Sequence, residues 1–240
     1  MQKTTLTDSV LARMGSRPAF SKVRLVGLLV MAGAILAAAS FLGKTALDLV
    51  VRGHSASTEP HQISIGGQAL LVPENLIRRR QDRQSGVRSQ LELYLRWPEL
   101  QGYTHATSAS FNGTSQKKDV VFVSVSSSDS KTDRLQGAYL AVTDRGETGA
   151  SGLELRQFKQ DIGFADEVLA VGERAPSEPF LARCLTKEMA ANSLAPCERR
   201  LPFINGLTIV YRFSEDLLPD WRLLDDMLLK RLTALRQADD

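Results

Sequence analysis

The longest apolar pattern in the chain is an uncharged run from Leu25 to Gly43, near the N-terminus. At about 1.5 Å of rise per residue, a helix of this length crosses the roughly 30 Å hydrocarbon core of a bilayer. Apolar positions continue as far as Val51, which indicates that the helix extends a turn or two beyond the membrane. We therefore expect a transmembrane helix with its extension over residues 25–51.

Small residues within this run raise two further questions, cleavage and self-association. Ala37-Ala38-Ala39 is typical of a signal-peptide cleavage site, and a cleaved signal peptide is the alternative interpretation. The polar leader over residues 1–24 is long for a signal peptide, which favours an uncleaved anchor. Small residues also recur at a spacing of four, which allows two spanning helices to pack closely as a homodimer. These pairs are Gly33/Ala37, Ala34/Ala38 and Ala39/Gly43.

Charge around the run predicts its orientation. The preceding tail, residues 1–24, carries five cations against the single acid Asp8, whereas two cations, Lys44 and Arg52, closely follow the run. An excess of Lys and Arg marks the cytoplasmic side of a span, so we expect a cytoplasmic basic tail and a translocated C-terminal domain. The formal net charge of the whole chain is +3, and the tail accounts for all of it. The basic balance therefore indicates topology and gives no reason to expect nucleic-acid binding.

Beyond the span the pattern changes to short apolar runs separated by turn signals. Gly, Ser, Thr and Pro are frequent over residues 52–61, which we interpret as a tether to a folded domain over residues 62–240. Within that domain, alternation of apolar and polar residues is typical of strands with one buried face. Gly66-Gly67 and Asn205-Gly206 each separate two such runs and predict tight hairpins. Strands are expected over residues 62–65, 68–72, 91–97, 119–126, 153–158, 167–171, 180–185 and both arms of 202–213.

Two stretches have the spacing of amphipathic helices, in which apolar residues recur every three or four positions. These are Leu135–Val142 and the longer Pro219–Gln237, whose first turn accommodates its proline. The charged stretch Glu74–Arg88 is predicted to be an irregular helix or a loop. Strands in hairpins with few helices between them indicate an α+β fold, an antiparallel sheet covered by one or two helices.

Cys184 and Cys197 are the only cysteines in the chain, and twelve residues separate them. Both lie in the domain expected on the exported side of the membrane, where a lone pair most simply forms a disulfide. Closing a loop of this length removes unfolded-state entropy worth about 3 kcal/mol. We therefore predict a disulfide between them, and two unrelated buried thiols are the alternative.

The domain has one basic cluster, formed by Arg78, Arg79, Arg80, Arg83 and Arg88. Such a cluster is able to bind an anionic surface, such as envelope polymer, lipid headgroups or an acidic partner. An ordinary solvated surface is the alternative. A further cation, Arg212, lies among apolar residues of a predicted strand, so it must either pair with a carboxylate or face water.

No sequence pattern assembles a catalytic, cofactor or metal site. Gly43-Lys44-Thr45 imitates a phosphate-binding loop, but Ala38 occupies the position of the required first glycine. His54, His61 and His105 are too scattered for metal-ligand spacing, and two of them fall in or beside the expected tether, where histidine is usually solvated. We therefore expect no cofactor, no metal and no nucleic-acid partner, and the sequence leaves enzymatic activity undecided.

Three segments of the domain carry a family resemblance. They are IGGQALLVPENLIR (65–78), LELYLRWPELQGY (91–103) and YRFSEDLLPDWRLLD (211–225). They resemble uncharacterised single-pass inner-membrane proteins from alphaproteobacteria-like genomes, and the similarity covers most of residues 62–230. The resemblance implies a bacterial inner-membrane address with a periplasmic domain. No activity is known for this family, so no functional residues are carried over.

The leading functional hypothesis is a non-enzymatic, membrane-anchored envelope protein that presents its periplasmic domain to another envelope protein. One alternative is a membrane-anchored hydrolase of the cell envelope, which uses dispersed carboxylates that no sequence pattern assembles. Another alternative is a transmembrane sensor or regulator whose basic tail contacts cytoplasmic partners.

Overall fold

The computed structural model describes residues 27, 30–40, 53–127, 137–149, 151–160, 163–175 and 178–236. The chain divides into two compact units, Met1–Val50 and Val51–Asp240. In the first unit, residues 30–40 are helical and exposed. No helix among the described residues has both the length and the apolar character needed to cross a bilayer. The predicted basic tail and both ends of the predicted span lie outside the described residues.

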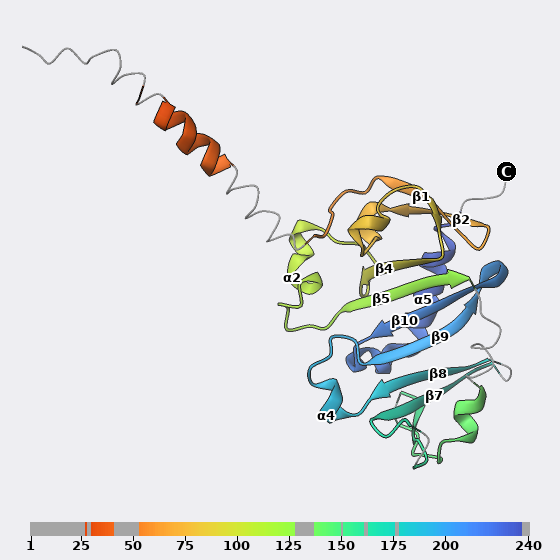
Figure 1. The fold of residues 1–240 in the computed structure, drawn as a ribbon. Coiled ribbons are helices and arrows are strands. Elements are labelled where there is room, and N and C mark those ends of the chain that lie inside the picture. The colour runs from red at the N-terminus through yellow and green to blue at the C-terminus, as the bar shows by residue number, and fades with distance from the viewer. Residues whose placement is uncertain are drawn as a thin grey trace, which may run out of the picture. The chain divides into compact units, whose positions relative to one another are not determined.

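The second unit is built on a seven-stranded sheet in which all neighbouring strands are antiparallel (Figure 1). The spatial order is β4-β5-β10-β9-β8-β7-β6. The strands are β4 (Gln90–Arg96), β5 (Val120–Ser127), β6 (Leu153–Gln157), β7 (Glu167–Ala175), β8 (Glu178–Leu185), β9 (Cys197–Phe203) and β10 (Leu207–Phe213). The predicted α+β class and antiparallel sheet are confirmed. β9 begins at Cys197 rather than near Pro202, because Arg199 occupies a core-facing position and hides the apolar alternation.

A smaller sheet with the order β2-β1-β3 shares its core with the large one. Its strands β1 (Pro60–Ile65) and β2 (Gln68–Pro73) form the predicted hairpin, whose turn residues Gly66 and Gly67 have φ angles of 56° and 82°. Positive φ at both positions is typical of a tight hairpin turn and favours glycine. β3 (Gly86–Arg88) pairs with β1 in parallel, a pairing that the sequence did not predict.

Helical segments connect the strands, and most are single turns. They are η1 (Glu74–Leu76), η2 (Arg80–Asp82), η3 (His105–Thr107), α2 (Ser108–Phe111), residues 137–141, α4 (Lys187–Ala190), η4 (Ile204–Gly206), η5 (Glu215–Asp220) and α5 (Trp221–Thr233). The predicted C-terminal helix begins at Trp221, because Pro219 lies in the preceding 3-10 segment. The charged stretch 74–88 is irregular, as predicted.

α5 covers one face of the large sheet (Figure 1). Its predicted apolar stripe is buried, and consists of Trp221, Leu224, Leu228, Leu232 and, just beyond the helix, Leu235. The stripe packs in one core with inward-facing strand residues such as Leu93, Val123 and Ile209. The backbone N–H of Leu71 in β2 donates to the carbonyl of Leu235 at 2.7 Å. The first hairpin of the domain is therefore attached to the end of its last helix.

One charged side chain, Asp225 of α5, lies inside this apolar interface and is fully buried. Its carboxylate accepts two hydrogen bonds from Arg199 of β9, both at 3.1 Å, and one from the Tyr211 hydroxyl of β10 at 2.9 Å. Arg174 of β7 pairs with it from the surface side. Burial, and then the Asp225 charge, raise the pKa of Tyr211 well above its ordinary value, so this hydroxyl remains a donor. A buried carboxylate persists only when it is paired and hydrogen-bonded, so these contacts fix the position of α5 on the sheet.

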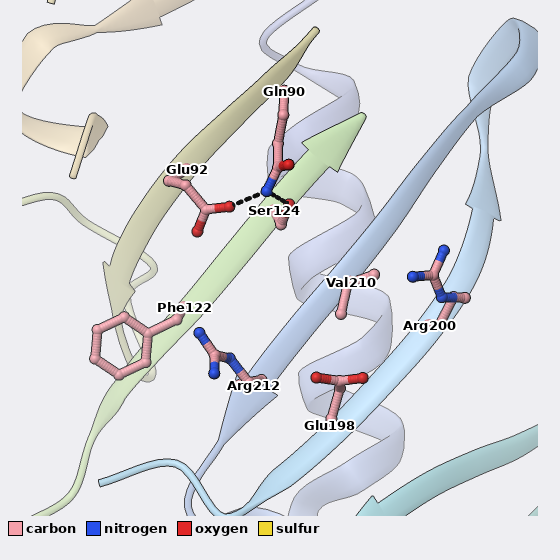
Figure 2. Close-up of a pocket in the computed structure, with 8 residues that line it drawn as sticks. All are labelled: Gln90, Glu92, Phe122, Ser124, Glu198, Arg200, Val210 and Arg212. Atoms are coloured by element: carbon pink, nitrogen blue, oxygen red, sulfur yellow. Dashed lines mark hydrogen bonds between the residues drawn. The ribbon is translucent and has the colours of Figure 1, made fainter. Parts of the chain in front are cut away.

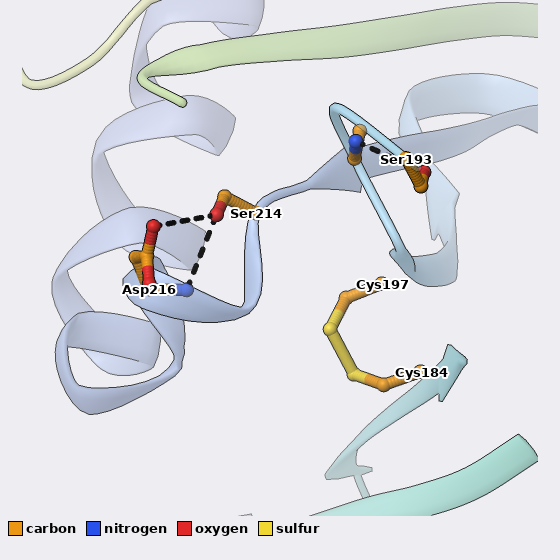
Figure 3. Close-up of a disulfide and its surroundings, with 6 residues drawn as sticks. Cys184, Ser193, Cys197, Ser214 and Asp216 are labelled. Carbon is orange, nitrogen blue, oxygen red and sulfur yellow. Dashed lines mark hydrogen bonds between the residues drawn. A yellow bond between two sulfur atoms is a disulfide. The ribbon is translucent and has the colours of Figure 1, made fainter. Parts of the chain in front are cut away.

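The predicted disulfide between Cys184 and Cys197 is present (Figure 3). The two cysteines face each other across β8 and β9, with their Cα atoms 4.0 Å apart, and both are buried. The bridge closes the loop 185–196, which contains α4. Within this loop the Ser193 hydroxyl accepts a hydrogen bond from the Ala195 amide at 3.3 Å. The disulfide and the strand pairing thus join β8 to β9 at the same pair of residues.

Replacing Asp225 by asparagine is expected to lower the free energy of unfolding by about 3–5 kcal/mol, because Arg199 is left buried without its counter-charge. Urea denaturation followed by circular dichroism measures this change. The neighbouring Asp226 supplies the control, because its side chain is 62% exposed and pairs with Arg174 at the surface. Asp226→Asn should cost at most about 1 kcal/mol. Equal losses in the two variants would contradict the role given to Asp225.

Candidate functional site

The face of the large sheet opposite α5 is covered only in part by the described residues. Above β8, the guanidinium of Arg183 lies 5.3 and 5.5 Å from the ring centres of Tyr139 and Phe164. Phe158 stacks on Phe164, with ring centres 4.8 Å apart, and completes an aromatic cluster of these three rings. The aromatic cluster covers the β7–β8 end of this face. Over β5, β10 and β9 the described residues leave part of this face exposed, whereas on β4 the outward-facing Tyr94 and Glu92 are only 1% and 7% exposed.

A groove of about 240 Å³ lies across these four strands, and we call it the sheet groove (Figure 2). Alternate residues of a strand share one face and stand beside the residues opposite them on the next strand. One such cross-strand row runs from Phe122 through Arg212 to Glu198. The residues that line the groove are Gln90, Glu92, Phe122, Ser124, Glu198, Arg200, Val210 and Arg212.

One side of the sheet groove holds its acid in place through hydrogen bonds. The Gln90 amide donates to the Glu92 carboxylate and, at 2.8 Å, to the Ser124 hydroxyl (Figure 2). Glu92 is only 7% exposed. Its carboxylate is therefore held against the sheet and is little exposed to solvent.

The second acid of the sheet groove, Glu198, is held on the opposite side. Arg183 of β8 donates to Glu198 at 3.2 Å and lies 3.4 Å from Glu167. The same guanidinium packs on the aromatic cluster, so its position is fixed from two directions. Glu198 therefore already has a cationic partner within the domain.

Arginines dominate the open part of the sheet groove. Arg212 is exposed at the centre of the groove, and its guanidinium projects above the strands (Figure 2). Of the two alternatives that the sequence left for this residue, pairing with a carboxylate or facing water, the structure therefore shows the second. Arg200 is half-buried on β9. Arg78 reaches the rim, with its guanidinium 5.0 Å from the centre of the Phe122 ring. The backbone N–H of Arg78 donates to the carbonyl of Glu92 at 2.9 Å, which fastens this loop to β4.

The structure divides the basic cluster that the sequence grouped together. Its first three members are exposed: Arg78, Arg79 and Arg80. Arg83 turns back onto its own loop and donates to the carbonyl of Ile77 at 3.1 Å. Arg88 lies 3.6 Å from the carboxylate of Asp82. Of the five arginines, Arg78 is the one that stacks on a groove residue, and the prediction of an anionic ligand for the cluster stays a prediction.

The segment predicted to be a tether packs along the domain, at the Phe122 end of the sheet groove. His54 stacks on Tyr103 with ring centres 4.9 Å apart, and its Nδ1 lies 3.2 Å from the hydroxyl of Tyr94, the cross-strand neighbour of Phe122. The expectation of a solvated His54 is therefore wrong, because the rings that receive it come from distant parts of the chain. Burial raises the pKa of Tyr94 to about 12.

Glu74 holds the next part of this segment. His61 Nε2 lies 3.2 Å from its carboxylate, and Ser55 also hydrogen-bonds to it. The hydrogen bond from Ser55, followed by the contact with His61, keeps the pKa of Glu74 below its ordinary value in spite of partial burial. The backbone N–H of Glu74 also donates to the carbonyl of Glu59 at 2.8 Å. The domain therefore includes residues from at least His54 onward.

A second hollow of about 550 Å³ lies beside Trp97. Arg96 pairs there with Glu99 at 2.8 Å, and Lys118 donates to the carbonyl of Ser193 at 2.8 Å, so these charges are engaged within the domain. Among the described residues, no group of three or more His, Cys, Asp or Glu side chains is placed to hold a metal ion. The sheet groove is therefore the stronger candidate site.

Sequence reasoning identified Arg78 and Arg212 separately and missed Arg200 and Phe122. Period-two alternation does place Arg200, Arg212 and Phe122 on the face opposite the core, so a signal for each residue existed. The order β5-β10-β9, which brings the three together, depends on pairings between strands far apart in the sequence. No local pattern reports those pairings.

No known protein family and no curated protein matches the chain in sequence. In structure it is similar to Smlt3025, an immunity protein of the Stenotrophomonas maltophilia type IV secretion system. That likeness has a TM-score of 0.55 and 10% identity, and covers 78% of this chain and 97% of the other. The chain is also similar to the iron-regulated outer membrane lipoprotein FrpD of Neisseria meningitidis, with a TM-score of 0.48, 11% identity and coverage of 76% and 95%. The first likeness shows a shared fold.

The substitution Glu74→Gln should lower the free energy of unfolding near neutral pH by about 1 kcal/mol. A carboxyl whose pKa is lower in the folded protein stabilises it above the unfolded value, near 4.5, and this contribution is lost as the pH falls through the folded value. The stability difference between native protein and variant should therefore shrink below pH 4.5. Urea denaturation across this range measures it, and a difference that grows with acid would contradict the assignment.

Proposed function

We propose that this protein is a non-enzymatic component of the bacterial envelope that binds a partner protein through the sheet groove. In this proposal the run Leu25–Gly43 anchors it in the inner membrane, with the basic tail in the cytoplasm and the α+β domain in the periplasm. The observation that carries the proposal is the exposed part of this face, on which β9, β10 and the loop after η1 present arginines around a half-exposed aromatic ring.

The composition of the sheet groove suits a protein partner. Arg and aromatic side chains are enriched where proteins bind one another, and they supply most of the energetic hot spots. Phe122 and Arg212 stand on paired strands, so their spacing is fixed by backbone hydrogen bonds. A fixed arrangement loses little entropy on binding and favours affinity.

Three observations support an envelope address. The cation excess before the run Leu25–Gly43 favours a cytoplasmic N-terminus. The disulfide between Cys184 and Cys197 suits an oxidising compartment such as the periplasm. Smlt3025, which shares the fold, is an immunity protein of a bacterial secretion system, which supports an envelope role without enzymatic turnover.

A reporter fused after Asp240 tests the topology. An alkaline phosphatase fusion should be active in intact cells, because this enzyme needs export to form its disulfides. A green fluorescent protein fusion at the same position should remain dark if it is exported unfolded. Activity of the cytoplasmic reporter alone would contradict the periplasmic assignment.

Site-specific photo-crosslinking tests the binding face. A benzoylphenylalanine at Val210, on the floor of the sheet groove, should give one defined protein adduct in intact cells of the source bacterium. The same group at Leu223, which is 53% exposed and lies on the helix that covers the opposite face, is the matched control and should not give this adduct. The adduct from Val210 should disappear when Arg212→Glu is added, because a charge of the wrong sign then stands in the groove.

Two outcomes would overturn the proposed function. One is a failure to label the groove selectively, with the same adduct pattern at Val210 and Leu223 or no adduct at either position. The other is an adduct from Val210 that persists in the Arg212→Glu variant. A circular dichroism spectrum equal to that of the native protein shows that the variant is folded, because Arg212 is exposed and carries no core contact.

A further inference from the structure

We infer that the partner presents an acidic segment to the sheet groove, with its carboxylates on Arg212, Arg200 and Arg78. This inference rests on the proposed function and adds the chemistry of the partner. The segment would be short and extended, with Asp or Glu side chains toward the arginines and an apolar side chain on the ring of Phe122. Charge complementarity of this kind selects partners and speeds their association.

The acids of the sheet groove are engaged by neighbouring side chains within the domain. Glu92 is buried and accepts a hydrogen bond from Gln90. Glu198 is paired with Arg183. Both acids that line the groove thus have partners within the domain, and three arginines, Arg78, Arg200 and Arg212, line or border the groove.

Arg212 has the strongest need for an external counter-charge. Within the part of the chain that the structure describes, no hydrogen bond or ion pair engages its guanidinium. It stands at the centre of the groove, with Phe122 and Glu198 as its direct cross-strand neighbours (Figure 2). A guanidinium offers donors in a planar fork that matches a carboxylate in two hydrogen bonds. A partner carboxylate placed over Phe122 is able to meet this fork directly.

Arg78 and Arg200 extend the positive surface to both sides of Arg212. The backbone of Arg78 is held at the rim by its hydrogen bond to β4, and its guanidinium lies over the ring of Phe122. Arg200 stands on β9, in the register position opposite Val210. The three arginines therefore follow the groove from the loop after η1 to β9.

The shape of the site favours a protein segment over a bilayer surface. The sheet groove is a hollow on the sheet, bordered on one side by Arg183 with its aromatic cluster and on the other by the loop that carries Arg78. A lipid surface is broad, and it would meet the exposed Arg79 and Arg80 at least as readily as the groove floor. A narrow chain with alternating acidic and apolar side chains reaches Arg212 and Phe122 together.

Fluorescence anisotropy with the full-length protein in non-ionic detergent tests the inference. The probe is a labelled peptide of alternating glutamate and leucine, and its counterpart of alternating lysine and leucine is the ligand control. The glutamate peptide should bind at low ionic strength and weaken as salt rises. Arg212→Gln should weaken it about tenfold, which corresponds to about 1.4 kcal/mol. Adding Arg78→Gln and Arg200→Gln should remove measurable binding.

The matched control variants are Arg79→Gln and Arg80→Gln, which remove exposed cations outside the groove and should change the affinity less than about twofold. Equal losses at Arg79 and Arg212, or equal binding of the lysine peptide, would overturn the acidic partner. Competition by mixed micelles of phosphatidylglycerol and the same detergent, lost on substitution of the same arginines, would overturn it in favour of a membrane surface. If the crosslink from Val210 stands while the glutamate peptide does not bind, the chemistry of the partner is wrong and the proposed function is not.

Discussion

Burying the carboxylate of Asp225 constrains how the whole domain is put together. An unpaired carboxylate in an apolar interface costs several kcal/mol, so α5 is stable only where Arg199 and Tyr211 reach that side chain. With leucines alone, the helix could shift along the sheet at little cost, since apolar contacts have no direction. The hydrogen bonds to Asp225 prevent such a shift, because they form in only one position of the helix. One face of the sheet is thereby filled by a helix in a single position, and part of the other face is surface.

The buried network and the sheet groove are two sides of the same pair of strands. On β9, Arg199 points to Asp225 and the next residue, Arg200, points to the groove. On β10, Tyr211 and Arg212 divide in the same way. Because successive side chains of a strand lie on opposite faces, contacts that fix the inner residues also fix the spacing of the outer ones. The buried contacts of Arg199 and Tyr211 thus position Arg200 and Arg212 on the surface in the absence of a partner.

Local features of the fold followed from the sequence, whereas its long-range polar contacts did not. The Gly66-Gly67 turn, the strand alternation and the stripe of α5 depend on residues close together in the chain, and each was predicted. Asp225 stands beside Leu224 with no local sign that it is buried, because its partners lie in other strands. The same holds for the site: the sequence singled out Arg78 and Arg212 separately, and each reaches Phe122 through contacts between distant segments of the chain. His54 was misjudged for the same reason.

The hydrogen bond between Leu71 and Leu235 has a consequence for the order of assembly during synthesis. It joins the first hairpin to the residues after α5, so the core stays incomplete until that helix has left the ribosome. Domains fold as units when their sequence has emerged, and this one cannot close early. The native core, which contains residues from both the first hairpin and α5, therefore forms only after nearly all of the domain has been synthesised.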